Sequence, residues 1–177
     1  MTDAASIRLI ISDVDGVWTD GKIIYGDRSE IKAFNVRDGL GAKLAQRAGI
    51  TVALLTSRRS LALERRAKEL GIAEIHQGAS NKLAAAEQIA LRLGVTFEQI
   101  LYAGDDLPDL APMTRVGISA APADAAAEVL NAATWKLKSA GGNGAFREVV
   151  ERLLRERGEW DALIREFASG RPEAASI

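Results

Sequence analysis

Short apolar runs alternate along this chain with longer segments whose apolar residues recur at helical spacing. The runs are rich in β-branched residues and stop at turn formers, which predicts buried strands at residues 7–12, 51–55, 74–77, 99–103 and 116–119. The helical pattern predicts helices at residues 38–48, 61–70, 82–93, 110–113, 123–132, 144–157 and 159–168. Strands separated by helices indicate an α/β fold, a doubly wound parallel sheet covered on both faces.

Two segments depart from this alternation. Runs at residues 22–25 and 31–35 flank Gly26-Asp27-Arg28-Ser29 and predict a small β-hairpin insertion at about residues 20–35. A C-terminal tail at about residues 158–177 ends in a polar stretch, 169–177, that we expect to be loose unless a partner holds it. With no internal repeat or linker, we expect a single domain over residues 1–177.

Composition narrows the possible functions. The 177 residues carry a net charge of −1, so they lack the basic field that attracts nucleic acids or anionic membranes. There is no cysteine and one histidine, His76, which excludes disulfides and metal sites built from cysteines or histidine clusters. The N-terminus lacks a signal-peptide pattern and no apolar run could span a bilayer. We therefore expect a cytoplasmic protein that binds neither nucleic acid nor membrane.

Polar residues follow the predicted strands at the edge of the sheet where α/β proteins place their chemistry. Asp13 and Asp15 follow the first strand, and Asp105 follows the fourth long run. Carboxylates gathered there repel one another unless a cation neutralises them, and oxygen ligands without histidine or cysteine favour Mg²⁺. With Lys82 nearby, such a site suits a phosphoryl group. One carboxylate would attack phosphorus while its neighbour supplies a proton to the leaving oxygen.

Four segments, in this order, resemble the motifs of the haloacid dehalogenase-like phosphatases: Asp13-Val-Asp15-Gly16, Thr56-Ser57-Arg58, Lys82, and Gly104-Asp105-Asp106-Leu-Pro-Asp109. Residues 34–39, 77–82 and 141–148 are similar to the small cap-less members that act on 3-deoxy-D-manno-octulosonate 8-phosphate (KDO 8-phosphate). The resemblance covers roughly residues 7–155. It implies a Rossmann-like fold without a cap domain and a Mg²⁺-dependent phosphatase that works through a phosphoaspartyl intermediate in lipopolysaccharide precursor biosynthesis.

The resemblance also implies a role for each matching position. Asp13 is the nucleophile, Asp15 the general acid and base, and Mg²⁺ is held by Asp13, Asp105 and the backbone carbonyl of Asp15. Asp106 and Asp109 support the metal ligands. The phosphate contacts Thr56, Ser57 and Lys82, the last counted with the catalytic residues. The sugar acid contacts Asn35, Val36, Arg37, Asp38, Gly39, Lys43, Arg58 and Arg66.

The interval between Asp13 and Thr56 has room for the hairpin and one helix, but not for a folded cap. An uncapped site stays open to water, which weakens electrostatic catalysis. Either a macromolecular substrate or a neighbouring subunit must then cover it. The resemblance implies the second, because members of this family form homotetramers in which hairpins meet centrally and adjacent chains wall the site.

Three positions depart from the family pattern: Ser57 stands where glycine is usual, Trp18 replaces a leucine, and Asn143 occupies a position that is often basic. Trp18 and Phe146 resemble relatives that act on nine-carbon sialic-type sugar acid 9-phosphates. Those relatives tend to carry an acidic residue where Arg58 stands, which favours the eight-carbon substrate and keeps the nine-carbon one as the alternative.

Plainer interpretations stay open for single residues. Asp13 and Asp15 could be a turn pair, Asp105 could be a charge at a helix N-terminus, and Lys82 could be a solvated helix-start lysine. A phosphate-binding regulatory module of the receiver type is the alternative from another class. Receivers take phosphate on an aspartate after a middle strand, where this chain has Thr56.

Overall fold

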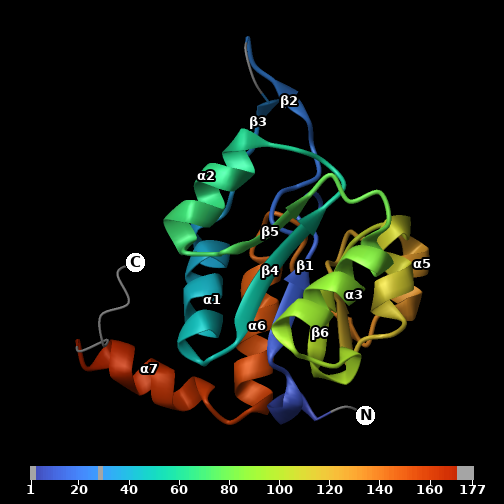
Figure 1. Ribbon diagram of the computed structural model, residues 1–177. Helices are drawn as coiled ribbons and strands as arrows, with labels where there is room; N and C mark the ends of the chain where they lie inside the picture. Colours follow the sequence, from blue (N-terminus) through green and yellow to red (C-terminus); the bar gives the residue numbers. More distant parts are fainter. Residues whose placement is uncertain (1–2, 28–29, 171–177) are drawn as a thin grey trace.

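The computed structural model describes residues 3–27 and 30–170. In this part of the chain, parallel strands form a six-stranded sheet in the order β5-β4-β1-β6-β7-β8, with helices on both faces (Figure 1). The strands are β1 (Leu9–Ser12), β4 (Thr51–Thr56), β5 (Glu74–Gln77), β6 (Ile100–Ala103), β7 (Ile118–Ala121) and β8 (Trp135–Lys136). The predicted doubly wound α/β fold is confirmed.

Two apolar clusters, one on each face of the sheet, hold the helices in place. Ile10 of β1 faces the first cluster, while Leu9 and Ile11 face the second, so the strand is apolar throughout because both of its faces are buried. The first face carries α1 (Val36–Arg47), α2 (Leu61–Leu70), α6 (Ala145–Glu156) and α7 (Trp160–Ala168). The second carries α3 (Lys82–Leu93), α4 (Leu110–Met113) and α5 (Ala127–Ala132).

Short 3₁₀ turns complete the framework: η1 (Ala4–Ser6), η2 (Phe97–Gln99) and η3 (Leu107–Asp109). The predicted helix at 123–132 begins later, at Ala127, because Ala125 N–H bonds the carbonyl of Pro122 in a turn. The strand predicted at 116–119 lies at Ile118–Ala121, and β8 was not predicted. Both misses involve short segments whose pairing with a neighbour, not their composition, makes them strands.

A hairpin projects from the body of the molecule, at the top of Figure 1. Its strands β2 (Ile24–Tyr25) and β3 (Glu30–Ile31) are antiparallel, with Ile24 opposite Ile31. They are shorter than the predicted runs at 22–25 and 31–35. Between Asp13 and Thr56 the described residues form this hairpin and α1, with no further domain. The end of the tail, residues 171–177, lies outside the described residues.

The order of the strands places the β1–β6 border at the centre of the sheet. From β1 the chain moves to β4 and β5 on one side, then returns to β6 on the other side of β1. Ligand sites of doubly wound sheets lie at the carboxyl ends of the strands, where the order reverses in this way. The N–H of Asp13 donates to the carbonyl of Ala103 at 2.8 Å, which extends the pairing one residue beyond β1. The residues that follow β1 and β6 therefore emerge side by side.

Candidate functional site

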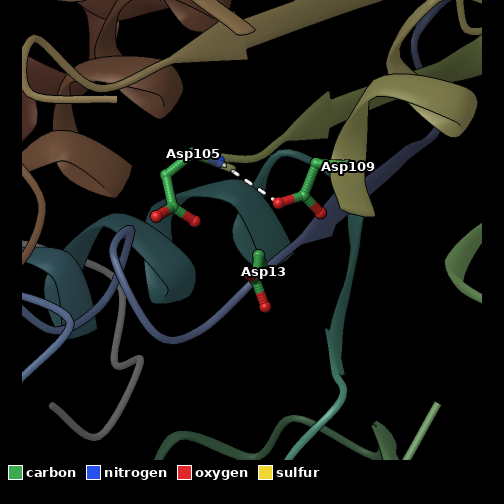
Figure 2. Close-up of side chains that lie close together, drawn as sticks. All are labelled: Asp13, Asp105 and Asp109. Atoms are coloured by element: carbon green, nitrogen blue, oxygen red, sulfur yellow. Dashed lines mark hydrogen bonds between the residues drawn. The ribbon is translucent and has the colours of Figure 1, made fainter. Parts of the chain in front are cut away.

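Three carboxylates meet at the ends of β1 and β6. Figure 2 shows Asp13, which follows β1, beside Asp105 and Asp109 from the connection after β6. One carboxylate oxygen of each lies within 4.8 Å of the others. Asp13 and Asp109 are buried and Asp105 is half-buried. Acidic groups this close in a partly desolvated site favour protonation or a bound cation.

Lys82 supplies one positive charge to this cluster. It is the first residue of α3, whose N-terminus is capped by the Asn81 side chain accepting from the N–H of Ala84. Its Nζ lies 2.7 Å from Asp13 Oδ2 and 2.7 Å from Asp109 Oδ1. Burial acts to lower the pKa of Lys82, but the two carboxylates outweigh it and raise that pKa. The lysine is therefore a charged partner of Asp13 and not a solvated helix-start residue.

Asp109 holds other site residues in place. Its Oδ1 accepts from Lys82 and, at 2.7 Å, from the hydroxyl of Tyr102, while its Oδ2 accepts from the N–H groups of Asp105 at 3.3 Å and Asp106 at 3.4 Å. A carboxylate with both oxygens so engaged has little capacity left for a metal. The geometry therefore gives Asp109 a supporting place beside the possible metal ligands.

Asp105 is the carboxylate with room for a cation. Its Oδ1 is buried and has no hydrogen-bond partner among the described residues. A Cβ on Gly16 would lie 2.0 Å from Asp105 Oδ2, so the missing side chain makes space for this carboxylate. Burial, then the charges of Asp13 and Asp109, raise the pKa of Asp105 to about 8. An oxygen-lined site with such uncompensated charge fits a hard divalent cation.

Asp13 has a raised pKa for the same main reason. Burial of its carboxyl group, followed by the charge of Asp109, raises the pKa to about 6, although Lys82 works in the opposite direction. One lysine does not offset the charge of all three carboxylates. The three carboxylates and the single lysine thus indicate that a second positive group binds at this edge of the sheet.

Asp15 lies beside the cluster and has partners of its own. Lys32, from the end of the hairpin, forms an ion pair with Asp15 Oδ1, and the Thr56 hydroxyl lies 3.5 Å from Oδ2. The Lys32 ammonium also lies 2.8 Å from Glu30 Oε1, and Glu30 Oε2 pairs with Arg58 at 2.6 Å. Sequence analysis assigned no role to Lys32 or Glu30. Their alternation with Ile31 places both on one face of the strand, but it does not show what that face contacts.

The predicted phosphate-binding residues cluster at the end of β4. Thr56 is the last residue of that strand and is buried, and its hydroxyl accepts from the N–H of Arg58 at 3.2 Å. The hydroxyl of Ser57 donates to the carbonyl of Ala79 at 2.9 Å. The extra side chain of Ser57, relative to the usual glycine, is thereby held against the loop that leads to α3. Asp106 is exposed and accepts from the N–H of Leu107 as the cap of η3.

The predicted sugar-contact residues 35–39 lie at the start of α1, and they differ in how far they are exposed. Asn35 is the N-cap of α1, because its side chain accepts from the N–H of Arg37 at 2.9 Å. Val36 and Arg37 are exposed. Asp38 is fully buried, and its Oδ1 accepts from the N–H of Arg147 at the start of α6. Burial raises the pKa of Asp38. Its side chain joins α1 to α6.

Gly39 and Arg66 lie against each other. A Cβ at Gly39 would be 2.2 Å from Arg66 Nη2, so the glycine lets the guanidinium cross α1. Lys43 lies farther along the helix, about 10 Å beyond Val36 at 1.5 Å per residue. Its Nζ is near Gly71, which ends α2 on the approach to the amino end of β5. Within one chain, the structure does not bring Lys43 to the carboxylate cluster.

A glycine loop packs on the segment that carries Asp13 and Asp15. A Cβ at Gly141 would lie 2.0 Å from the carbonyl oxygen of Gly16, and the N–H of Gly142 donates to the carbonyl of Val17 at 3.0 Å. Trp18, one of the departures from the family pattern, is buried, with its ring centroid 4.2 Å from that of Phe146. These two aromatic residues therefore contribute to packing beneath the site.

Comparisons with known proteins agree with this geometry. Residues 66–148 match the model of the haloacid dehalogenase-like hydrolase family. The chain is 45% identical over 162 residues to the 3-deoxy-D-manno-octulosonate 8-phosphate phosphatase of Salmonella typhi, covering 91% of this chain and 86% of the relative. The chain belongs to this phosphatase family. The resemblance described from the sequence motifs is confirmed, and the receiver-like alternative is not supported.

Solved structures of KDO 8-phosphate phosphatases have the same fold. The enzyme from Moraxella catarrhalis, in complex with magnesium ion, phosphate ion and KDO, matches with a TM-score of 0.91 and 40% identity over 93% of this chain and 95% of that one. A cobalt-bound form from Haemophilus influenzae matches with a TM-score of 0.90 and 41% identity over 94% and 99% of the two chains. Among the described residues, no helix is long and apolar enough to cross a membrane.

Proposed function

We propose that this protein is a Mg²⁺-dependent phosphatase that hydrolyses KDO 8-phosphate to KDO and phosphate. The observation that carries the proposal is the pairing of Lys82 with Asp13 beside the unpartnered oxygen of Asp105. The substrate is supported by relatives named for this reaction and by the neighbour crystallised with KDO and phosphate. The product would enter lipopolysaccharide precursor biosynthesis in the cytoplasm.

The reaction has two steps. A carboxylate oxygen of Asp13 attacks phosphorus, and the bond from phosphorus to the sugar oxygen breaks as the carboxyl group of Asp15 gives that oxygen its proton. The result is a phosphoaspartyl group on Asp13 and a free sugar acid. The Asp15 carboxylate then takes a proton from water while the water oxygen attacks phosphorus, which releases phosphate and restores the Asp13 carboxylate.

The surrounding residues hold the phosphate and the metal. Asp13, Asp105 and the backbone carbonyl of Asp15 would bind Mg²⁺, which, when bound, offsets the negative charge of the phosphoryl oxygens. Lys82 adds a second positive charge, and the hydroxyl of Thr56 adds a hydrogen-bond donor. The backbone of Ser57 also contacts the phosphate. Asp106 and Asp109 keep the ligands in position.

The sugar acid would extend from the phosphate towards the start of α1 and the arginines of the β4–α2 region. Arg58 and Arg66 are suited to its carboxylate because guanidinium groups bind carboxylates through two parallel hydrogen bonds. In support, the Nε of each arginine is buried without a hydrogen-bond partner among the described residues. The remaining proposed contacts are Asn35, Val36, Arg37 and Gly39. Of the other predicted contacts, Asp38 is fully buried against α6, and Lys43 lies near Gly71, away from the carboxylate cluster of its own chain.

We also propose a homotetramer of single-domain chains. The hairpin exposes Ile24, Tyr25 and Ile31, with Tyr25 82% exposed. A two-stranded hairpin is marginal alone in water and gains stability when its apolar side chains are buried. Packing of hairpins between chains would provide that burial and bring a neighbour to the uncapped site.

The test is phosphate release from KDO 8-phosphate and from a nine-carbon sialic-type sugar acid 9-phosphate, each with and without Mg²⁺. We expect activity only with Mg²⁺, preference for the eight-carbon substrate, and a loss of at least about 1,000-fold in Asp13→Asn. Asp20→Asn, an exposed aspartate in the same loop, is the matched control and should keep normal activity. Normal activity of Asp13→Asn would reject the mechanism, and preference for the nine-carbon substrate would reject the substrate.

A further inference from the structure

The hairpin buries a lysine against the acid–base residue. The side chain of Lys32 is 1% exposed, although the preceding residue, Ile31, is exposed. Lysines are almost never buried to this extent unless their charge is paired. The pairs here are Asp15 Oδ1 and Glu30 Oε1. The burial of Lys32 therefore places a positive charge directly on one oxygen of Asp15.

We propose that Lys32 is a positioning residue that assigns the transferred proton to one oxygen of Asp15. This inference rests on the proposed function, in which Asp15 gives its proton to the leaving sugar oxygen. An ammonium group has hydrogen-bond donors and no acceptor, so the oxygen that faces it accepts and does not carry a proton there. The Thr19 hydroxyl is a second donor to the same oxygen, Oδ1, at 3.5 Å.

The other oxygen, Oδ2, is thereby left to carry the proton. Its neighbour is the Thr56 hydroxyl at 3.5 Å, and a hydroxyl both donates and accepts, so it tolerates a protonated or an ionised Oδ2. Thr56 also belongs to the proposed phosphate site. The proton is therefore held on the side of the carboxyl group where the leaving oxygen would lie.

Glu30 fixes the lysine in turn. Its Oε1 lies 2.8 Å from the Lys32 ammonium and its Oε2 2.6 Å from Arg58, which ties β3 to the end of β4. The contacts with Lys32 and Arg58 lower the pKa of Glu30, which keeps it ionised between them. Lys32 therefore has a partner on each side and a defined direction towards Asp15.

Two substrates with different leaving groups distinguish this positioning role of Lys32 from a structural one. The alkoxide of KDO 8-phosphate needs a proton from Asp15, whereas the 4-nitrophenolate of 4-nitrophenyl phosphate leaves without one. In Lys32→Met, with Mg²⁺, we expect kcat/KM to fall about 100-fold on KDO 8-phosphate, the lower end of general acid–base contributions, and less than about 3-fold on the aryl phosphate. Lys32→Arg should restore most of the loss because it keeps the donor charge.

Lys22→Met is the matched control, because Lys22 is an exposed lysine near the base of the same hairpin, paired with Asp20. It should keep normal activity on both substrates. Equal losses on both substrates in Lys32→Met, or no recovery in Lys32→Arg, would overturn the inference and point to phosphate binding or folding instead. If Lys32→Met does not fold, Glu30→Gln replaces it, with a smaller loss expected and again confined to the alkyl phosphate. The Asp13→Asn result tests the proposed function separately.

Discussion

At the scale of single residues, the site is arranged so that negative charge exceeds the positive charge available within the chain. Lys82 serves Asp13 and Asp109 together, and Asp105 lies beside them with an unpartnered oxygen. Burial makes this excess costly because charged groups lose their hydration. A divalent cation would offset this excess, so we expect stability, pH and metal binding to be linked.

The first consequence is a pH-dependent stability of the metal-free protein. The pKa of Asp105 is raised from its ordinary 3.8 to about 8, and that of Asp13 to about 6. Between pH 4 and 8 the folded protein therefore holds protons that the unfolded chain has lost, so its stability falls as the pH rises through this window. We expect the Tm in EDTA to be lower at pH 8 than at pH 5, by about 2–4 °C for each kcal/mol lost.

Magnesium should reverse this trend, because the ion binds the ionised carboxylates and displaces their protons. The rise in Tm on adding Mg²⁺ should thus be larger at pH 8 than at pH 5, and thermal unfolding followed by circular dichroism measures both. Asp105→Asn should flatten the pH dependence in EDTA and reduce the magnesium effect. An EDTA Tm that increases from pH 5 to pH 8 would contradict the assignment of these raised pKa values.

The residues of the cluster could be predicted because short motifs carry them, and the topology of a parallel sheet brings the motifs together. Lys32 could not, since its burial depends on how the hairpin folds back over Asp15, which no local pattern encodes. Asp38 is similar. The family resemblance implied a sugar contact for Asp38, but its observed partner is the start of α6, more than a hundred residues away in the chain.

At the scale of elements, glycines let three connections approach one another at the site. Gly16 makes room for Asp105, and Gly141 places its loop directly on the carbonyl of Gly16. Because a Cβ at Gly141 would be 2.0 Å from that backbone oxygen, the loop that carries Asp13 and Asp15 would have to move. Such overpacking costs about 1–3 kcal/mol.

We therefore expect Gly141→Ala to lower both stability and activity, with kcat reduced at least about 10-fold because reacting groups tolerate little displacement. Gly94→Ala is the control: Gly94 has a positive φ of 65° but nothing within 4 Å of its Cβ position. It should lose about 1 kcal/mol and keep its kcat. Urea unfolding and steady-state kinetics measure the two effects. Equal kcat values for both variants would show that this contact does not position the catalytic loop.

Elements with a strong periodic pattern and a glycine stop were predicted closely. The helices at 61–70 and 82–93 have the observed bounds, and both end at a glycine in the left-handed conformation. The hairpin is present where it was predicted, but its strands are shorter than predicted, and β8 was missed, because each of these strands has only two residues, too few for a period to be read. The bounds of the hairpin strands depend on how β2 and β3 pair with each other, and β8 is a strand because it pairs with β7.

At the scale of the whole molecule, the exposed hairpin and the uncapped site are the features that point beyond a single chain. The sheet and its helices bury their apolar faces within one chain. The hairpin leaves Ile24, Tyr25 and Ile31 exposed. Glu30 and Lys32, on either side of Ile31, contact residues of the site. A contact between hairpins would thus be linked to the position of Asp15.

We accordingly predict that Ile24→Asp dissociates the proposed tetramer, because a carboxylate buried between apolar hairpin side chains loses its hydration. Light scattering at micromolar concentration should give a tetramer mass for the wild type and a smaller mass for the variant, with activity reduced as the site loses its wall. Leu91→Asp is the matched control, since Leu91 is 85% exposed on α3, away from the hairpin, and it should leave mass and activity unchanged. A monomeric wild type would reject the tetramer, and a tetrameric, fully active Ile24→Asp would remove the hairpin from the interface.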